Sequence, residues 1–179
     1  VTFGPNGQIR VDPESLTPAI HAFAAGAREI RDFDAESRDI PGRSFAYGFD
    51  YLMHGYMMKV FEPHFSGSSA LELGCYRGEF SKRIAKRYSS VTVVDGSLEN
   101  VLDAIEASGA MGFCEDFEHV ELPSKYDAIF LIHAIEHTDD PVLVLKRCRE
   151  WLKPDGRLFL AVPNATAASR QIAVNMGLI

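Results

Sequence analysis

The sequence predicts an α/β fold in which helices pack against a mostly parallel sheet. From Ser69 onward, short apolar runs alternate with segments whose apolar residues follow helical spacing. This pattern is typical of crossover units that place successive strands in parallel. The first apolar run ends at a glycine-bounded turn, Gly74 to Gly78, and the second ends at an acidic residue, Asp95. Parallel sheets bind ligands at the carboxyl ends of their strands, where both features are expected to lie.

The first 66 residues lack this alternation, so we expect an N-terminal helical segment ahead of a core over residues 67–179. Residues 18–34 carry apolar side chains at helical spacing, and a Pro-Gly pair at 41–42 marks a turn. Residues 47–61 are rich in aromatic side chains and methionine. This stretch predicts either an ordinary helix packed on the core or a lid over a binding cleft.

The core elements follow in order along the chain. Strands are expected at residues 70–73, 91–94, 111–114, 127–132 and 157–162. Helices are expected after Gly78, over Leu98–Ile105, and from Asp140-Pro141, because an aspartate followed by proline is a typical helix start. The last of these helices is expected to end before a turn at residues 154–156. The side chains expected to be buried on the first and last of these helices are Phe80, Ile84, Ala85 and Tyr88, and Leu145, Cys148 and Leu152.

Composition narrows the class of partner. The formal net charge is −7, whereas proteins that bind nucleic acid through its phosphates usually carry a basic face. The basic cluster Lys82, Arg83, Lys86 and Arg87 is short and typical of a solvated helix face. We therefore expect a small-molecule or protein substrate and no nucleic acid.

The sequence also bears on the cellular setting. No apolar run approaches the roughly 20 residues that cross a bilayer, so no membrane partner is expected. The first residues are polar and interrupted by glycine and proline, unlike a secretory leader. The three cysteines, Cys75, Cys114 and Cys148, fit no metal-binding spacing. A reducing, cytoplasmic setting is the simplest expectation, and the sequence indicates no oligomeric state.

The glycine turn after the first strand is a candidate ligand site. Gly74 lets the backbone turn sharply and removes a side chain where a ligand would approach. Gly78 lets the next helix pack close to the preceding strand and present its N-terminal N–H groups to the cleft. Glu72 lies inside the strand, where a charge is costly without partners. It is either part of the site or a structural carboxylate that hydrogen-bonds the turn.

Acidic residues follow the next two strands. Asp95 comes about 20 residues after the glycine turn, the offset at which an acid accepts ribose hydroxyls in nucleotide-binding folds. Taken alone, an acid at this position is equally typical of a helix cap. Asp116 and Phe117 follow the third strand. An acid there is placed to accept the exocyclic amine of adenine, and an aromatic ring is placed to stack on the base.

A cluster of titratable residues follows the fourth strand. His133 is a candidate general base near neutral pH. Together with Glu136, His137, Asp139 and Asp140 it also suggests a metal site. We expect no metal, because Glu136 and His137 are equally suited to brace the helix that follows.

Taken in order, these segments resemble the motifs of class I S-adenosylmethionine (SAM)-dependent methyltransferases. The matching segments cover about residues 69–164 and read LELGCYRG, VTVVDGS, EDF, YDAIFLIHAIEHTDDP and LKPDGRLFLAVPN. The chain is similar to the small-molecule O-methyltransferases of ubiquinone-biosynthesis type. The resemblance implies a Rossmann-like three-layer sandwich, SAM as the cofactor, and methyl transfer to a small-molecule acceptor.

The resemblance also implies roles for single residues. Glu72, Gly74, Cys75 and Gly78 would surround the methionine part of SAM, and Asp95 would hold its ribose.

At the other end of the cofactor, Gly96, Asp116 and Phe117 would contact adenine. Ile132 and His133 would pass close to the sulfonium, with His133 as the candidate base if the acceptor must lose a proton.

The family fold has seven strands, the last two forming an antiparallel hairpin. The sequence stops at Ile179, shortly after the fifth expected strand, so that hairpin is not expected in this chain, and residues 165–179 are expected to begin a further helix. Two other functions remain open. One is a non-catalytic SAM-binding or interaction module. The other is a nicotinamide-dependent oxidoreductase, which the missing middle glycine of G-x-G-x-x-G disfavours.

Overall fold

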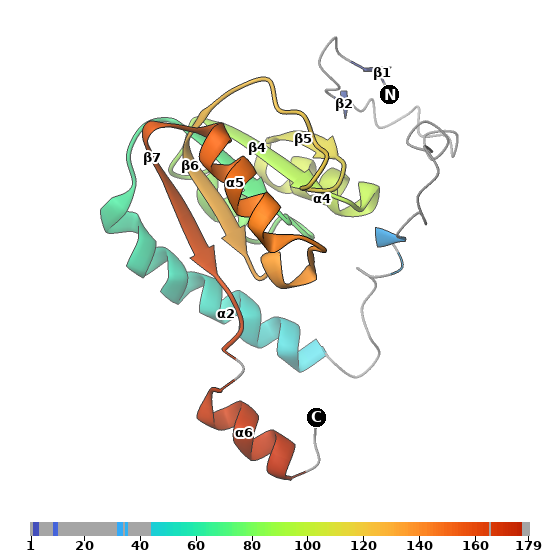
Figure 1. Cartoon of the computed structure of the whole chain (residues 1–179), viewed down its shortest axis with the longest axis vertical. Helices are drawn as coiled ribbons and strands as arrows, with labels where there is room; N and C mark the ends of the chain where they lie inside the picture. The colour runs from blue at the N-terminus through green and yellow to red at the C-terminus, as the bar shows by residue number, and fades with distance from the viewer. Residues whose placement is uncertain are drawn as a thin grey trace.

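The computed structural model describes residues 2–3, 9–10, 32, 33, 35, 44–164 and 166–176 (Figure 1). The helix expected over residues 18–34 lies outside these residues except for Asp32 and Phe33. The turn expected at residues 41–42 also lies outside them.

The core is a parallel sheet of five strands, as predicted, in the order β5-β4-β3-β6-β7. Its strands are β3 (Ser69–Leu73), β4 (Ser90–Asp95), β5 (Met111–Cys114), β6 (Tyr126–Ile132) and β7 (Leu152–Ala161). The chain runs outward from β3 through β4 to β5, and then returns to the other side of β3 to form β6 and β7. The strand order therefore reverses between β3 and β6, and ligands of such sheets bind at the carboxyl ends beside this point.

The start of β7 differs from the prediction, because the strand begins at Leu152 and not at Arg157. Leu152 pairs with Tyr126, and Arg157 pairs with Ala128, with a shift of register between the two pairs. A β-carbon on Gly156 would lie 2.8 Å from the carbonyl oxygen of Tyr126. The residues expected to form a free turn are thus absorbed into the strand as an irregularity, which glycine allows by its lack of a side chain.

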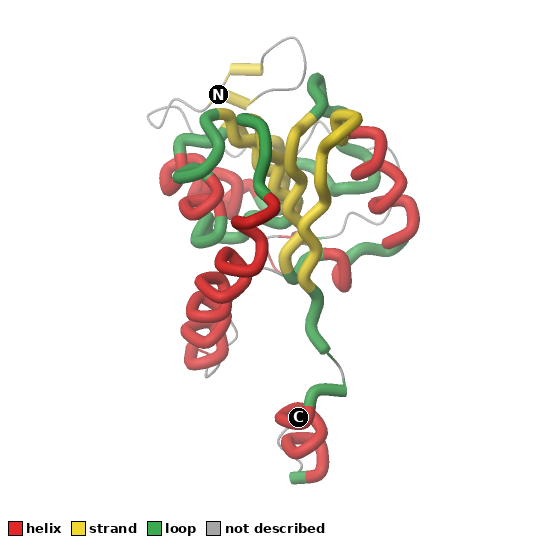
Figure 2. The backbone as a smooth tube through the Cα atoms, turned by 90° about the vertical axis from the view of Figure 1, so that its left-hand side faces the viewer, coloured by secondary structure: helices red, strands yellow, loops and turns green. Residues whose placement is uncertain are grey.

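Helices cover both faces of the sheet, which gives three layers (Figure 2). One face packs against α2 (Ser44–Phe61), α3 (Ser81–Ile84) and α4 (Leu98–Ser108), and the other packs against α5 (Pro141–Trp151). A short 3-10 turn, η2 (Glu62–His64), follows α2, and a second, η3 (Ile135–His137), precedes α5. The three-layer α/β sandwich predicted from the sequence is confirmed.

Helix α2 packs on the sheet as an ordinary core helix. Met58 is buried in the core, and Met57 and Phe61 pack against the same cluster of buried side chains. The helix begins at Ser44, three residues before the expected start. Its outer face exposes Leu52, Tyr56 and Val60, each more than half accessible. The arrangement of these residues agrees with the packed-helix alternative.

Helix α5 begins where the sequence predicts but buries a different face. The Asp140 carboxylate accepts a hydrogen bond from the backbone N–H of Leu143 at 2.9 Å, and Pro141 is the first helical residue. The buried side chains are Val144, Cys148 and Trp151. The prediction that Leu145 and Leu152 are buried with Cys148 is wrong, because Leu145 is 38% exposed and Leu152 already belongs to β7.

The remaining elements lie at the two ends of the chain. β1 (Thr2–Phe3) and β2 (Ile9–Arg10) form a two-stranded antiparallel sheet. α6 (Ala168–Asn175) stands apart from the sheet, beyond the end of β7 (Figures 1 and 2). None of the described helices combines the length and the apolar character required of a membrane span.

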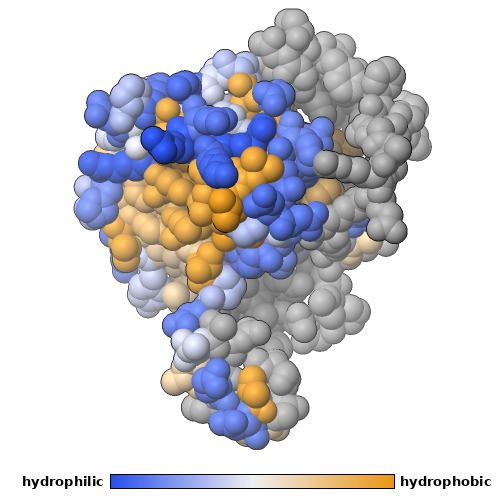
Figure 3. All heavy atoms as spheres, in the orientation of Figure 1, coloured by the Kyte–Doolittle hydropathy of each residue, from blue (hydrophilic) through white to orange (hydrophobic). Residues whose placement is uncertain are grey.

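An apolar surface remains on the α5 face of the molecule. Figure 3 shows a broad hydrophobic area over β7 and α5. Leu160 lies in the edge strand β7 and is 42% exposed, Val162 directly follows that strand and is 50% exposed, and Val142 of α5 is 58% exposed. We call these three residues together with Leu145 the β7–α5 apolar surface.

Candidate functional site

The sequence-predicted site residues come together at the carboxyl edge of the sheet. Asp95 pairs with Cys114 at the ends of β4 and β5, Leu73 pairs with Val94 beside it, and Ile132 ends β6. Because neighbouring parallel strands end at the same edge, the loops that follow them share one side of the sheet. This is the place predicted for a ligand.

The turn after β3 has the strained backbone that the sequence predicts. Gly74 and Gly78 have φ angles of 80° and 76°, and Tyr76 between them has a φ of 43°. Residues with side chains rarely adopt this left-handed region, so the backbone favours glycine at both positions, and Tyr76 is strained. A β-carbon on Gly74 would also lie only 2.5 Å from the Ala134 β-carbon. The bare backbone at Gly74 therefore lies against the loop that follows β6.

Gly78 serves a different contact from the one expected. A β-carbon placed on it would lie 2.7 Å from the Ala104 α-carbon and 3.0 Å from the Ala107 β-carbon, both on α4. The close approach that Gly78 allows is thus between the turn and α4. The expectation of close packing against the preceding strand did not identify this partner.

Glu72 lies inside the core. It is 1% exposed, and its carboxylate accepts a hydrogen bond of 2.5 Å from the hydroxyl of Ser81, the first residue of α3. Burial raises the pKa of the Glu72 carboxyl to about 8, with a smaller contribution from the charge of Asp95. This geometry matches the structural alternative, in which the carboxyl joins β3 to the helix after the turn.

The Asp95 carboxylate holds two loops together. Its Oδ1 accepts hydrogen bonds from the backbone N–H of Ser97 at 3.0 Å and from the side-chain amide of Asn100 at 3.1 Å. Its Oδ2 accepts one from the backbone N–H of Tyr76 at 3.1 Å and lies 3.9 Å from the Cys75 sulfur. Burial raises the pKa of the Asp95 carboxyl, although these hydrogen bonds oppose the rise.

The side chain of Cys75 points beneath the turn. It is 3% exposed, and its sulfur lies 3.8 Å from the carbonyl oxygen of Asn100. Burial raises the pKa of the thiol well above its ordinary value, and the neighbouring carboxyls of Asp95 and Glu72 add to the rise. A neutral, buried thiol of this kind is unreactive. Any contact of Cys75 with a ligand would therefore involve its backbone.

The two residues predicted to form part of the site after β5 have different surroundings. The Asp116 carboxylate lies 2.6 Å from Nδ1 of His119 and accepts the backbone N–H of Glu118 at 2.8 Å. Phe117 packs against the core on the α5 face, and its Cζ would lie 3.5 Å from a β-carbon on Gly74. Phe117 thus lies against the glycine turn, whereas Asp116 is held by its neighbours.

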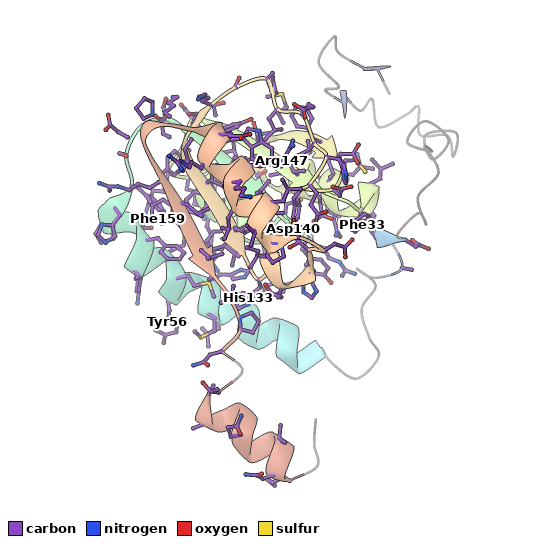
Figure 4. The ribbon with its side chains drawn as sticks, viewed as in Figure 1. Phe33, Tyr56, His133, Asp140, Arg147 and Phe159 are labelled. Atoms are coloured by element: carbon purple, nitrogen blue, oxygen red, sulfur yellow. The ribbon has the colours of Figure 1, made fainter. Side chains whose placement is uncertain are left out.

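His133 follows β6 at the middle of the carboxyl edge (Figure 4). Its φ angle is 51°, and its backbone N–H donates to the carbonyl oxygen of Ala161 at 2.9 Å. Its Nδ1 lies 3.8 Å from a carboxylate oxygen of Glu136, and its side chain is 33% exposed. Ile132 before it is 7% exposed. A strained, partly exposed histidine at a strand end is a typical feature of a functional site.

The structure adds residues that the sequence did not single out. Asn100 of α4 reaches the Asp95 carboxylate, and Phe33 of the N-terminal segment covers Gly96. His54 of α2 packs edge-on against the ring of Phe80, with 5.1 Å between ring centroids. Its Nδ1 is buried without a hydrogen-bond partner, and its pKa falls to about 4, chiefly because of burial. Only Asn100 had a signal in the sequence, as the third residue after the helix-capping Ser97.

The grouping of possible metal ligands also differs from the one suggested by the sequence. Among the described residues, Asp116, Glu118 and His119 bring three ligand atoms within 4.8 Å of one another. Their carboxylates already accept hydrogen bonds from the backbone and from His119. Acidic groups of this kind are common on protein surfaces, and we assign no metal to them.

Comparison with known proteins identifies the family to which this chain belongs. The methyltransferase domain family matches residues 45–178. The chain belongs to this family. The methyltransferase domain described here is 32% identical over 117 residues to the ubiquinone biosynthesis O-methyltransferase of Xylella fastidiosa (strain M23), a match that covers 61% of this chain and 47% of that protein. It is 33% identical over 116 residues to the protein of the same name from Xanthomonas campestris pv. campestris (strain B100), covering 60% and 48%. The methyltransferase domain therefore spans about half the length of these relatives.

Solved structures agree on the fold of the methyltransferase domain. The N-methyltransferase NodS from Bradyrhizobium japonicum WM9, in complex with S-adenosyl-L-homocysteine, aligns with a TM-score of 0.57 at 18% identity, covering 72% of this chain and 65% of that one. Coclaurine N-methyltransferase, bound to N-methylheliamine and the same nucleoside, aligns with a TM-score of 0.52 at 27% identity, covering 59% and 34%. These alignments confirm the Rossmann-like arrangement.

Proposed function

We propose that the protein binds SAM across the carboxyl edge of its sheet and transfers the methyl group to a nucleophilic atom of a small-molecule acceptor. The observation that carries this proposal is Asp95 at the end of β4, joined by a hydrogen bond to the glycine turn of β3 in a chain of the methyltransferase domain family. An acid beside a glycine-bounded turn is the arrangement with which such sheets hold a ribose.

The residues at this edge fit a nucleoside. A carboxylate offers about four lone-pair sites. Oδ1 of Asp95 accepts hydrogen bonds from Ser97 and Asn100, and Oδ2 accepts one from the N–H of Tyr76 and lies 3.9 Å from the Cys75 sulfur. A sugar hydroxyl that donates to Oδ2 would approach the side of the carboxylate where the long thiol contact lies. We infer that the first sugar contact forms at Oδ2.

The other assignments extend this proposal along the edge. Gly74, Gly78 and the backbone of Cys75 would border the methionine part of SAM, with Glu72 bracing the turn from inside the core. Gly96 would lie against adenine.

Near adenine, Phe117 would contribute its ring and Asp116 would accept the exocyclic amine after releasing His119. Ile132 and His133 would lie near the reacting sulfur. These assignments follow the family resemblance residue by residue.

The protein's contribution to the reaction is mainly positional. When bound, SAM supplies an electrophilic methyl group whose leaving group is a neutral thioether. The residues of the carboxyl edge orient the acceptor in line with that group and exclude water, which contributes roughly 7–11 kcal/mol at best. His133 directs Nδ1 toward Glu136. Its Nε2 is therefore the atom that would take a proton from an acceptor that must lose one.

The proposal is tested by calorimetric titration with S-adenosylhomocysteine, the demethylated product. We expect Asp95→Ala to weaken binding by at least about tenfold, because a charge-assisted hydrogen bond is lost. Glu106→Ala is the matched control, since it removes one carboxylate from the exposed side of the neighbouring α4. Unchanged affinity in a folded Asp95→Ala variant would contradict the ribose assignment.

Two other functions predict different outcomes. A nicotinamide-dependent oxidoreductase would bind NAD in the same titration, and we expect no binding of NAD. A non-catalytic SAM-binding module would bind the nucleoside and transfer no label. Methyl-labelled SAM incubated with a panel of small-molecule hydroxyls, amines and thiols separates that module from the enzyme, because we expect label in one class of acceptor.

A further inference from the structure

Phe33 lies directly on the glycine that follows Asp95. A β-carbon built on Gly96 would lie 2.4 Å from Cγ of Phe33, and 2.6 and 2.7 Å from its two δ carbons. These are three atoms of one side of the ring. The Phe33 ring therefore rests against the backbone of Gly96 with no room for an intervening group.

The position of Phe33 is supported by local structure. The Asp32 carboxylate accepts a hydrogen bond from the backbone N–H of Ala35 at 2.9 Å, and Phe33 and Ala35 have helical backbone. Aspartate that accepts an N–H three residues later is a typical helix cap. Phe33 is thus held in position by a capped helical turn, and its side chain is half-buried. Figure 4 shows it reaching the sheet from the N-terminal part of the chain.

Phe33 occupies the side of Gly96 toward which a side chain would point, so adenine lying against that side would have to displace it. Gly96 immediately follows the proposed ribose ligand Asp95, so the base that continues from the sugar is expected on this residue. The Phe33 ring already fills the space directly beside Gly96, where three of its carbons lie within 2.7 Å of a β-carbon built on this residue.

We infer that Phe33 is a plug in the adenine position, which covers Gly96 in the nucleoside-free protein and leaves when the nucleoside binds. This Phe33 plug rests on the proposed function, since it names what competes with SAM at the same site. Its consequence is a lower apparent affinity. A contact that closes the site in about nine molecules of ten weakens apparent binding about tenfold.

The direction of a mutational effect tests the plug. We expect Phe33→Ala to tighten binding of S-adenosylhomocysteine by about three- to tenfold in calorimetric titration, because the competing ring is gone. Tyr56→Ala is the matched control, since it removes an aromatic side chain from the outer face of α2, and we expect unchanged binding. Adding Asp95→Ala to Phe33→Ala should abolish the gain if the nucleoside occupies this edge.

The same titrations separate the two hypotheses. If wild-type protein binds the nucleoside and Phe33→Ala binds it equally well or more weakly, the plug is overturned and the proposed function stands. Weaker binding would mean that Phe33 forms a wall of the adenine site. If neither protein binds, the proposed function is overturned and the plug with it.

Discussion

At the scale of single residues, two carboxyl groups at neighbouring strand ends have different environments. Asp95 accepts hydrogen bonds from backbone N–H groups of two loops, whereas Glu72 is fully buried with the hydroxyl of Ser81 as its donor. Burial raises both pKa values, and that of Glu72 reaches about 8. Burial therefore favours the protonated, uncharged form of Glu72, which is joined to α3 by the hydroxyl of Ser81.

This state of Glu72 predicts how stability depends on pH. The unfolded chain loses this proton near the ordinary pKa of 4.5, and the folded chain keeps it up to about 8. Between these values the folded state binds more protons, so the contribution of Glu72 makes the free energy of unfolding fall as pH rises. Glu72→Gln still accepts from Ser81 and does not titrate. We expect the fall between pH 5 and 8 to be smaller in this variant, measured by denaturant unfolding across that range.

Glu79→Gln is the matched control, because Glu79 is a partly exposed acid on the same turn. An identical pH slope in wild-type protein and Glu72→Gln would show that Glu72 is ionised in the folded state.

The residue scale also shows what the sequence could predict at the site. Residue types placed at strand ends were sufficient to locate Gly74, Asp95 and His133 at one edge, because parallel strands end together. The directions of their side chains were not predictable. Asp95 is bound by Asn100 of α4, and Gly96 is covered by Phe33, which comes from a segment with no predicted link to the sheet. Such contacts depend on tertiary packing, which spacing along the chain does not encode.

At the scale of secondary structure elements, the turn after β3 and helix α4 approach each other at Gly78. The order of strands and helices was predictable from the alternation of apolar runs, and the Asp140-Pro141 helix start was also correct. The buried face of α5 and the early start of β7 were not predictable from the sequence. Apolar residues lie on more than one side of α5, and Gly156 permits an irregularity in β7 that reads as a turn in the sequence.

The contact at Gly78 predicts a large loss of stability on substitution. Gly78→Ala combines a left-handed backbone with a β-carbon 2.7 Å from the Ala104 α-carbon. We expect a loss of about 2–4 kcal/mol in the free energy of unfolding, from the backbone conformation and from overpacking. Gly109→Ala is the matched control, because it has a φ of 71° and no atom within 4 Å of the new β-carbon.

For Gly109→Ala we expect a loss of about 1–2 kcal/mol, from the backbone alone. Chemical denaturation of both variants measures the difference. Equal losses would show that the turn moves away from α4 at little cost.

At the scale of the whole molecule, the sheet ends in an edge strand beside exposed apolar side chains. The β7–α5 apolar surface includes Leu160, which is 42% exposed on that edge strand (Figure 3). Exposed edge strands with apolar side chains pair with other chains. We expect the 179-residue chain to associate in solution as its concentration rises, and Leu160→Lys to reduce this association while changing stability by less than about 0.5 kcal/mol.

Sedimentation velocity over a concentration series measures this effect. Val174→Lys on α6 is the matched control, because it adds the same charge at a residue that is 50% exposed and distant from β7. An equal reduction of association by both substitutions would mean that net charge, and not the β7–α5 apolar surface, governs it.

The reversal of strand order at β3 has a consequence for how the chain tolerates change in length. β3 lies between β4 and β6 in the sheet. The ends of β4 and β6 are therefore each about 4.8 Å from the end of β3, whatever the length of the chain that connects these strands. The segment between β5 and β6 crosses back over the sheet, and its length does not determine the distances between the ends of β3, β4 and β6. Insertions there would lengthen the protein and leave the spacing of Gly74, Asp95 and His133 intact. Insertions within β3, β4 or β6 would shift that spacing by one residue or more.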